Sequence, residues 1–192
     1  MAKLKIVGIV GSPRVRGNTE TMVFEVLEGA KSKGAETEMI AIRGRNIRMC
    51  NGCLECEGSG ACIYDDDMRE ILKKLEEARG IVIGSPTYFD NVTGLLKNFI
   101  DRTLPLYYTG KLRGKFLAAT AVGEAEMESI NKVISYLKGF GEIYEMKFLG
   151  SVAAIGRAPG SVRENENTIR ELRQLGERLA EVIKKSSEVK KE

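Results

Sequence analysis

Apolar residues recur along the chain with two alternating spacings. Short, nearly continuous apolar runs predict strands buried on both faces, as in a parallel sheet, and they cover residues 5–10, 81–84, 116–122 and 147–154. A weaker run with polar alternation at 36–42 predicts a strand at the sheet edge. Apolar residues spaced three and four apart predict helices between these runs, with stripes over 22–30, 68–78, 95–100, 127–137 and 169–183.

Five strands that alternate with helices predict an α/β fold with a doubly wound parallel sheet, because right-handed crossovers place helices on both faces. We expect a single domain over residues 1–192, since neither a repeat nor an interdomain linker interrupts the alternation. Such a sheet binds its ligand beyond the carboxyl ends of the strands. The loops expected at this edge, where candidate binding residues belong, are 11–19, 43–66, 85–94, 121–126 and 155–163.

Composition narrows the classes of function. The 192 residues are 43% apolar and 30% charged, as in an ordinary globular protein. A net charge of +3 argues against a dedicated nucleic-acid binder, and the absence of histidine excludes a Ser-His-Asp triad and any His-ligated metal. Apolar runs fall short of the ~20 residues of a membrane helix. The first residues read as a strand rather than a signal peptide, so we expect a cytoplasmic protein that binds no membrane.

The segment GSPRVRGNT at 11–19 follows the first predicted strand and opens the first predicted helix. Free N–H groups and a partial positive charge at a helix start suit a phosphate. The segment is neither a P-loop nor the dinucleotide GxGxxG motif. The alternative is a plain strand-to-helix turn capped by Asn18. The residues that would bind a phosphate are polar, cationic or small: Ser12, Arg14, Arg16, Gly17, Asn18 and Thr19.

All four cysteines of the chain lie close together in one predicted loop. They form the pattern C-x2-C-x2-C-x5-C, which is close to the spacing that binds a [4Fe–4S] cluster. Zinc is the main rival, because four thiolates also satisfy zinc, and uncoordinated thiols or adventitious disulfides are a third reading. The predicted metal ligands are Cys50, Cys53, Cys56 and Cys62.

Three consecutive aspartates at 65–67 resemble a hard-metal site, but a predicted helix begins directly after them. Carboxylates at a helix start accept hydrogen bonds from free N–H groups and complement the helix dipole. We therefore interpret these residues as a helix cap, with Asp67 and Glu70 at the spacing of a capping box.

Basic side chains precede the first cysteine. They would offset the negative charge of a thiolate-bound cluster or dock an acidic electron donor, and the alternative is a solvated basic loop. These residues are Arg43, Arg45 and Arg48.

The loop at 11–19 resembles the FMN-phosphate loop of the NADPH-dependent FMN reductases, a branch of the flavodoxin-like superfamily. The segment GSPTYFDNVTGLLKNFIDR at 84–102 resembles the part of that family which contacts the isoalloxazine ring. Without the resemblance, its two aromatic residues are a small surface cluster. The resemblance implies a flavodoxin-like sheet in the order 2-1-3-4-5 with a cysteine-rich insertion. By this resemblance the residues near the flavin ring are Pro86, Thr87, Tyr88, Phe89, Asn91, Val92 and, in a third loop, Gly123.

The cysteine motif together with both flavin segments resembles the iron–sulfur flavoproteins of anaerobic archaea and bacteria over residues 5–155. This resemblance implies one FMN and one [4Fe–4S] cluster per chain, with no catalytic side chain. The donor would be reduced ferredoxin or NAD(P)H, the acceptor a small oxidant or quinone, and the assembly a homo-oligomer, either dimer or tetramer. Two alternatives stay open: an NAD(P)H-dependent FMN or quinone reductase with a structural or zinc-binding cysteine loop, and a non-enzymatic redox sensor or carrier.

Overall fold

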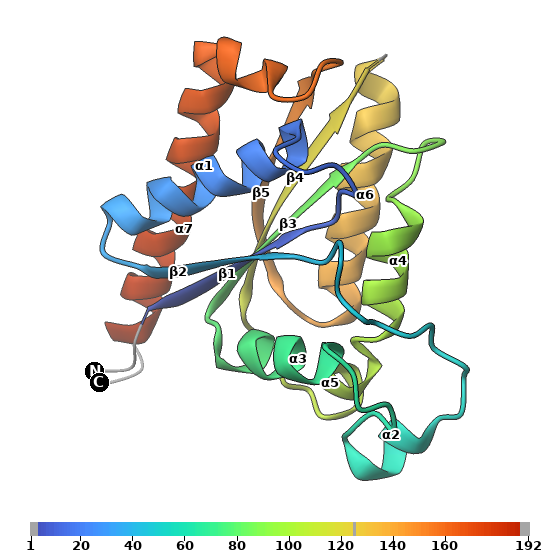
Figure 1. Cartoon of the computed structure of the whole chain (residues 1–192). Helices are drawn as coiled ribbons and strands as arrows, with labels where there is room; N and C mark the ends of the chain where they lie inside the picture. Colours follow the sequence, from blue (N-terminus) through green and yellow to red (C-terminus); the bar gives the residue numbers. More distant parts are fainter. Residues whose placement is uncertain (1–3, 125, 189–192) are drawn as a thin grey trace.

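The computed structural model describes residues 4–124 and 126–188. Five parallel strands form one sheet in the order β2-β1-β3-β4-β5 (Figure 1), which confirms the predicted flavodoxin-like arrangement. β2, predicted at an edge, lies at an edge. The strands are β1 (Lys5–Val10), β2 (Glu36–Ala41), β3 (Gly80–Pro86), β4 (Phe116–Gly123) and β5 (Lys147–Ile155).

Helices cover both faces of the sheet, as the alternating pattern predicts. One face carries α1 (Asn18–Ser32) and α7 (Glu166–Glu188), which pack against each other. The opposite face carries α3 (Met68–Glu77), α4 (Gly94–Asp101) and α6 (Met127–Ile143). Figure 1 shows the two layers on either side of the twisted strands.

β1 explains why the central strands are continuous apolar runs. Ile6 and Val10 pack in the core beneath α1 and α7, whereas Val7 and Ile9 pack in the core on the other side, and all four are fully buried. Successive side chains of a strand point to opposite faces. A strand with helices on both sides therefore needs apolar residues at every position.

Three short elements have no counterpart in the sequence pattern. They are α2 (Glu55–Ser59), α5 (Leu104–Tyr108) and a 3-10 turn, η1 (Ser161–Glu164). Segments of four or five residues are too short to show a helical period. α2 lies inside the cysteine loop, so that loop contains a helical turn. None of the helices in the described part of the chain is long and apolar enough to cross a membrane.

Candidate functional site

A cavity of about 480 Å³ opens beyond the carboxyl ends of β1, β3, β4 and β5. This volume lies within the roughly 300–1,000 Å³ of ordinary small-molecule sites. Four of the five loops expected at this edge supply its walls, and the cysteine loop at 43–66 supplies none. We call it the flavin cavity. Its lining residues are Ser12, Arg14, Asn18, Thr19, Pro86, Thr87, Tyr88, Phe89, Val122, Gly123, Glu124, Ser129 and Gly156.

Some residues predicted near the flavin do not line this cavity. The backbone N–H of Arg16 donates to Glu20 Oε2 at 2.8 Å, and Gly17 is the residue that precedes the first turn of α1. Asn91 Oδ1 accepts from the N–H of Val92 at 2.8 Å, and the Val92 side chain is buried in the core. These four residues shape the loops rather than the cavity wall.

Hydrogen bonds fix the first two cavity loops to each other. The N–H of Gly11 donates to the carbonyl of Gly84 at 2.8 Å, so the loops leave β1 and β3 side by side. The buried hydroxyl of Thr93 donates to the carbonyl of Gly11 at 2.7 Å and accepts from the N–H of Leu96 at 3.0 Å. Thr93 thus caps α4 and holds the first loop at the same time.

Backbone bonds fix the remaining cavity loops. The N–H of Thr87 donates to Val122 O, and the N–H of Gly156 donates to Gly123 O, each at 2.8 Å. A side chain at Gly123 would place its Cβ only 2.4 Å from Thr87 Cγ2. The glycine predicted in the third loop is therefore required by the close approach of the second.

Asn18 has a structural task that its sequence position does not reveal. Its Nδ2 donates to the carbonyl of Ala158 at 2.9 Å, and its Oδ1 accepts from the N–H of Val162 at 3.2 Å. The side chain therefore ties the start of α1 to the segment after β5. The alternative of a turn capped by Asn18 is wrong, because Gly17 occupies the cap position and no side chain caps α1.

An exposed aromatic turn stands at the cavity wall. Tyr88 and Asn91 exchange two backbone hydrogen bonds, and Phe89 and Asp90 between them have φ angles of +51° and +62°. Two left-handed residues at the tip are typical of a tight hairpin turn. The Phe89 side chain is fully exposed, while Asp90 is held to Lys132 of α6 at 2.6 Å. The hydrogen bond from Lys132 lowers the pKa of Asp90.

The lining residues that the sequence did not indicate come mainly from the third loop and from α6. Glu124 lies 4.0 Å from the guanidinium of Arg14 and 3.8 Å from that of Arg157. The hydroxyl groups of Ser129 and Thr87 lie 3.2 Å apart. These residues carry no motif, so their place in the cavity follows only from the register of the strands.

The four cysteines line one separate hollow, which we call the cysteine hollow. It holds only about 20 Å³ of free space, and its opposite wall comes from the end of α4 and the start of α5. Cys56 is buried, whereas Cys50 and Cys53 are exposed. Burial, together with the neighbouring cysteines, raises the pKa of the Cys56 thiol.

The donor set of the cysteine hollow fits an iron–sulfur cluster. Thiolates are the usual ligands of such clusters, and a hydrogen-bond donor near the sulfurs is a common companion. The hollow combines four cysteines with the buried guanidinium of Arg102, whose Nε–H has no acceptor among the described residues. Across residues 4–124 and 126–188, however, three or more His, Cys, Asp or Glu side chains do not converge on one point.

Arg102 and Asp66 form a buried ion pair beside this hollow. Their side chains are 1% and 0% exposed, and the guanidinium donates to both carboxylate oxygens at 2.8 and 3.0 Å. Burial alone would raise the pKa of Asp66, but the hydrogen bonds from Arg102 and from the N–H groups of Arg48 and Met68 lower it overall. Burial alone would likewise lower the pKa of Arg102, and Asp66 and Cys62 raise it.

The interpretation of residues 65–67 as a helix cap is confirmed only in part. Asp66 Oδ1 accepts from the N–H of Met68 at 3.1 Å, as a cap does. The capping box predicted for Asp67 and Glu70 is wrong, because the Asp67 side chain does not cap α3. Asp67 Oδ2 instead accepts from the N–H of Asn46 at 2.9 Å.

Both ends of the cysteine loop are held together at its base. The N–H of Asp67 donates to the carbonyl of Asn46 at 3.1 Å, so these two residues are joined in both directions. Arg102 Nη1 donates to the carbonyl of Arg48 at 2.6 Å, and Asn98 of α4 donates to Ile47 O at 3.0 Å. The loop therefore leaves and rejoins the fold at one fixed place.

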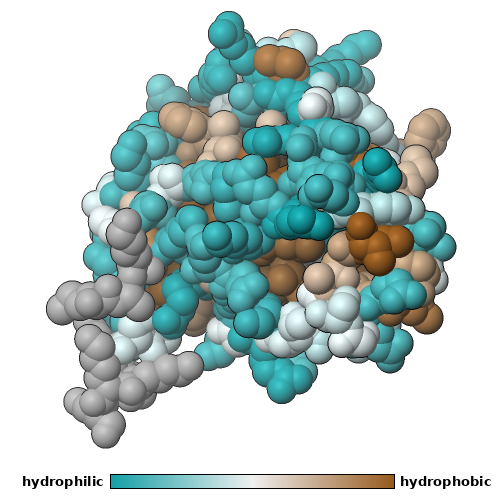
Figure 2. Space-filling model, turned by 60° about the horizontal axis from the view of Figure 1, so that its bottom comes forward, coloured by the Kyte–Doolittle hydropathy of each residue, from teal (hydrophilic) through white to brown (hydrophobic). Residues whose placement is uncertain are grey.

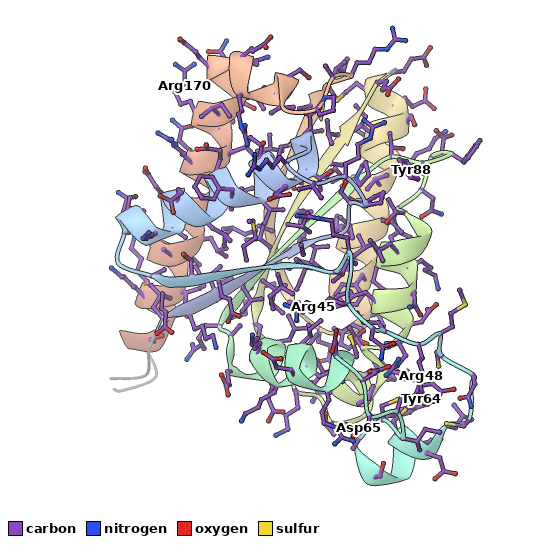
Figure 3. The ribbon with its side chains drawn as sticks, in the orientation of Figure 1. Arg45, Arg48, Tyr64, Asp65, Tyr88 and Arg170 are labelled. Atoms are coloured by element: carbon purple, nitrogen blue, oxygen red, sulfur yellow. The ribbon has the colours of Figure 1, made fainter. Side chains whose placement is uncertain are left out.

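The basic residues before the first cysteine have different surroundings. Arg43 is paired with Glu20 of α1 at 3.0 Å and does not line the hollow. The Arg48 guanidinium lies 5.3 Å from the centre of the Tyr64 ring, and that of Arg102 lies 5.0 Å from the same ring. Figure 3 shows Arg48 and Tyr64 together near the cysteine loop, with Arg45 apart from them.

The flavin cavity and the cysteine hollow lie at opposite ends of α4. Tyr88 lies beside the start of this helix and Tyr64 beside its end (Figure 3). Eight helical residues span about 12 Å. The cysteine loop therefore lies apart from the four loops that line the flavin cavity, and it turns away from the carboxyl edge of the sheet (Figure 1).

The cysteine loop also exposes apolar side chains. Figure 2 shows brown, hydrophobic atoms at several places on a mostly hydrophilic face, among them the side on which Figure 1 places α2. The exposed apolar residues of the loop are Met49, Leu54 and Ile63.

Known proteins with similar sequences identify the family of the chain. Residues 4–160 match the family of NADPH-dependent FMN reductases. An iron–sulfur flavoprotein of Methanocaldococcus jannaschii is 37% identical, over 94% of this chain and 98% of its own. One from Archaeoglobus fulgidus is 33% identical, over 94% and 80%, and one from Methanosarcina thermophila is 34% identical, over 80% and 81%.

Solved structures agree with the fold. A WrbA-like flavodoxin from Agrobacterium tumefaciens has a TM-score of 0.69 at 17% identity, over 96% of this chain and 99% of that one. Sequence and fold define the class as an FMN-dependent oxidoreductase of flavodoxin-like architecture. The chain belongs to the NADPH-dependent FMN reductase family and, within it, to the iron–sulfur flavoproteins.

Proposed function

We propose that this oxidoreductase passes electrons between a donor, reduced ferredoxin or NAD(P)H, and a small oxidant or quinone, using FMN and one [4Fe–4S] cluster. The observation that carries the proposal is that one chain holds both a flavin-sized cavity and a hollow lined by four cysteines. The names of its relatives support the same pairing. FMN exchanges one or two electrons and a cluster exchanges one, while the protein supplies position and electrostatics.

The flavin cavity offers two unlike walls for FMN. Ser12 in the loop after β1 and Thr19 in the first turn of α1 are buried polar residues, and free N–H groups at the helix start favour a phosphate. Arg14 adds a positive charge at the cavity. The opposite wall, from Pro86 to Phe89, is apolar and aromatic, which suits a flat ring. The two walls thus support a phosphate at the first loop and the ring at the second.

The cysteine hollow would hold the cluster through Cys50, Cys53, Cys56 and Cys62. Cys56 is the most buried of the four and lies on α2. Cys50 and Cys53 are exposed, which places one side of the site at the surface. This placement supports exchange of electrons with an external protein donor.

The proposal includes a homo-oligomer, either a dimer or a tetramer. Exposed apolar side chains on the loops around the flavin cavity support it, since monomers seldom expose such groups together. Val15, Phe89 and Ile155 are 66%, 102% and 57% exposed. Light scattering behind a sizing column measures the state directly.

Anaerobic purification tests the two-cofactor proposal. We expect FMN, iron and acid-labile sulfide in the wild-type protein, with four iron atoms for each FMN in a [4Fe–4S] protein. Cys53→Ser should lose iron and sulfide and keep FMN, because Cys53 lies at the hollow and not at the cavity. Wild-type protein that holds FMN without iron or sulfide would refute the cluster.

A second candidate is an NAD(P)H-dependent FMN or quinone reductase whose cysteine loop is structural or binds zinc. Its structural form is favoured by the small free space of the cysteine hollow and by the absence of a convergent metal group in the described residues. A quinone-reducing NAD(P)H dehydrogenase of Rhizobium johnstonii is 31% identical over 52% of the chain. Rapid bleaching of bound flavin by NADPH, unchanged in Cys53→Ser, would support this candidate.

A further inference from the structure

Arg102 stands out as a buried cation that its known contacts do not fully satisfy. Nη1 and Nη2 are occupied by Asp66 and by the carbonyl of Arg48. Nε, in contrast, is buried and its N–H has no acceptor within the part of the chain that the structure describes. An unpaired buried donor is costly, so we expect Nε–H to gain an acceptor when the cysteine hollow is filled.

The surroundings of Arg102 indicate that partner. Arg102 and Cys62 line the same hollow. The sulfur of Cys62 does not complete a hydrogen bond of ordinary geometry to Nε. A thiolate is a stronger acceptor than a thiol, and sulfur ligands of iron–sulfur clusters commonly accept such bonds.

We propose that Arg102 is a positioning residue of the cysteine hollow, which closes the base of the loop through Asp66 and Arg48 and donates its Nε–H to the sulfur of Cys62 when the cluster is bound. The inference rests on the proposed function, because it requires the cluster. It gives the Arg102 side chain two separable effects. The first effect is structural, because the two hydrogen bonds to Asp66 hold the base of the cysteine loop in place. The second is electrostatic, because the positive charge and the Nε–H stabilise the reduced, more negative cluster.

The sign of the electrostatic effect follows from burial. The Arg102 side chain is 1% exposed, so solvent and salt screen its charge weakly. A cluster gains negative charge on reduction, and a nearby cation together with a hydrogen bond to sulfur favours that state. Arg102 therefore raises the reduction potential, whereas Asp66 has the opposite charge and does not.

Three variants of the anaerobically isolated holoprotein separate these effects. We expect Arg102→Gln and Asp66→Asn both to release iron to a chelator about tenfold faster than the wild type, because both open the clamp. Only Arg102→Gln should lower the potential, by about threefold in the one-electron reduction equilibrium or ~30 mV. Arg102→Lys keeps the charge without Nε–H and should fall between the wild type and Arg102→Gln.

Arg69→Gln is the matched control. Arg69 forms a 3.1 Å pair with Asp65, the carboxylate next to Asp66 in the chain, but both side chains are mostly exposed. Arg69→Gln removes one positive charge close to the cysteine loop, as Arg102→Gln does. It should leave the rate of iron release and the reduction potential unchanged. FMN content of each variant reports whether the rest of the fold is intact, and Arg102→Lys decides the matter where Arg102→Gln does not fold.

The outcomes separate this inference from the proposed function. Iron and sulfide in the wild type, with equal potentials in Arg102→Gln, Arg102→Lys and Arg69→Gln, would overturn the role of Arg102 and leave the cluster standing. If the reduction potential of Asp66→Asn fell as far as that of Arg102→Gln, Arg102 would act only by holding the loop, and its electrostatic effect on the cluster would be refuted. Wild-type protein without iron and sulfide would overturn both.

Discussion

The flavin cavity and the cysteine hollow are built by different means. Four loops that leave neighbouring strands form the cavity, and backbone hydrogen bonds such as Gly11 to Gly84 and Thr87 to Val122 join them. A single loop, the end of α4 and the start of α5 form the hollow, and the base of the loop depends largely on the side chains of Arg102, Asp66 and Asp67.

This difference indicates how sensitive each site is to amino-acid substitution. Backbone bonds between parallel strands survive most substitutions, because every residue except proline supplies the same groups. An ion pair of two buried side chains is lost with either partner. The cavity should therefore tolerate single substitutions that the hollow does not.

Asp66→Asn gives the largest expected effect on stability. It leaves the buried Arg102 guanidinium without its counter-charge, and removal of one partner of a buried pair costs about 3–5 kcal/mol. Urea unfolding of the isolated protein measures the loss. Asp65→Asn is the matched control, since the Asp65 side chain is 86% exposed and should leave the midpoint unchanged. Equal unfolding midpoints for Asp66→Asn and Asp65→Asn would contradict the prediction that the buried ion pair stabilises the cysteine hollow.

The pH dependence sharpens the same prediction. The pKa of Asp66 lies below its ordinary value of 3.8, so the folded state favours the charged carboxylate. Its stabilisation is complete above that value and is lost as the pH falls through the lowered folded pKa. The gap in unfolding free energy between wild type and Asp66→Asn should be constant from pH 7 to about pH 5 and close below pH 3.8. If this difference in unfolding free energy persisted below pH 3.8, the charge of Asp66 would not be its cause.

Asn18→Ala tests the side-chain tie that the cavity does contain. It removes the acceptor of the buried N–H of Val162, which costs about 1–3 kcal/mol. Chemical denaturation measures the change, and Asn131→Ala on the exposed surface of α6 is the control. We expect a smaller loss than for Asp66→Asn. If Asn18→Ala lost more stability than Asp66→Asn, the cavity rather than the hollow would be the site more sensitive to substitution.

Gly123→Ala gives the smallest expected effect and acts on FMN alone. The new Cβ would lie 2.4 Å from Thr87 Cγ2 and 2.9 Å from Ile130 Cγ1, so the second and third loops must separate. A fall of about tenfold in FMN affinity corresponds to ~1.4 kcal/mol, and fluorescence titration of the flavin-free protein measures it. Gly139→Ala, with open space at its Cβ, should bind FMN normally. Loss of iron in Gly123→Ala would show that the sites are coupled.

Much of the fold follows from the sequence, because buried parallel strands leave a plain signal. The runs at 5–10 and 116–122 agree with β1 and β4, and the polar alternation at 36–42 placed β2 at the edge. α2 and α5 were missed because five residues do not establish a period. What the sequence reveals is thus the layer structure, and what it hides is the short connections.

The sites were predictable in their residue types but not in their pairings. Cys50 to Cys62 could be grouped from spacing alone, and they line one hollow. The partnership of Asp66 with Arg102 joins positions 36 residues apart, and no local pattern reports it. Asn18 was assigned to a ligand from its place at a helix start, yet its hydrogen bonds go to a segment beyond β5.

The two hydrogen bonds between Asn46 and Asp67 have an evolutionary consequence. Since these residues meet in both directions, the stretch between them begins and ends at one point of the scaffold. The closure entropy of such a segment grows slowly with its length. Relatives can therefore lengthen, shorten or exchange this module without displacing the strands, and an engineer can graft it at the same junction.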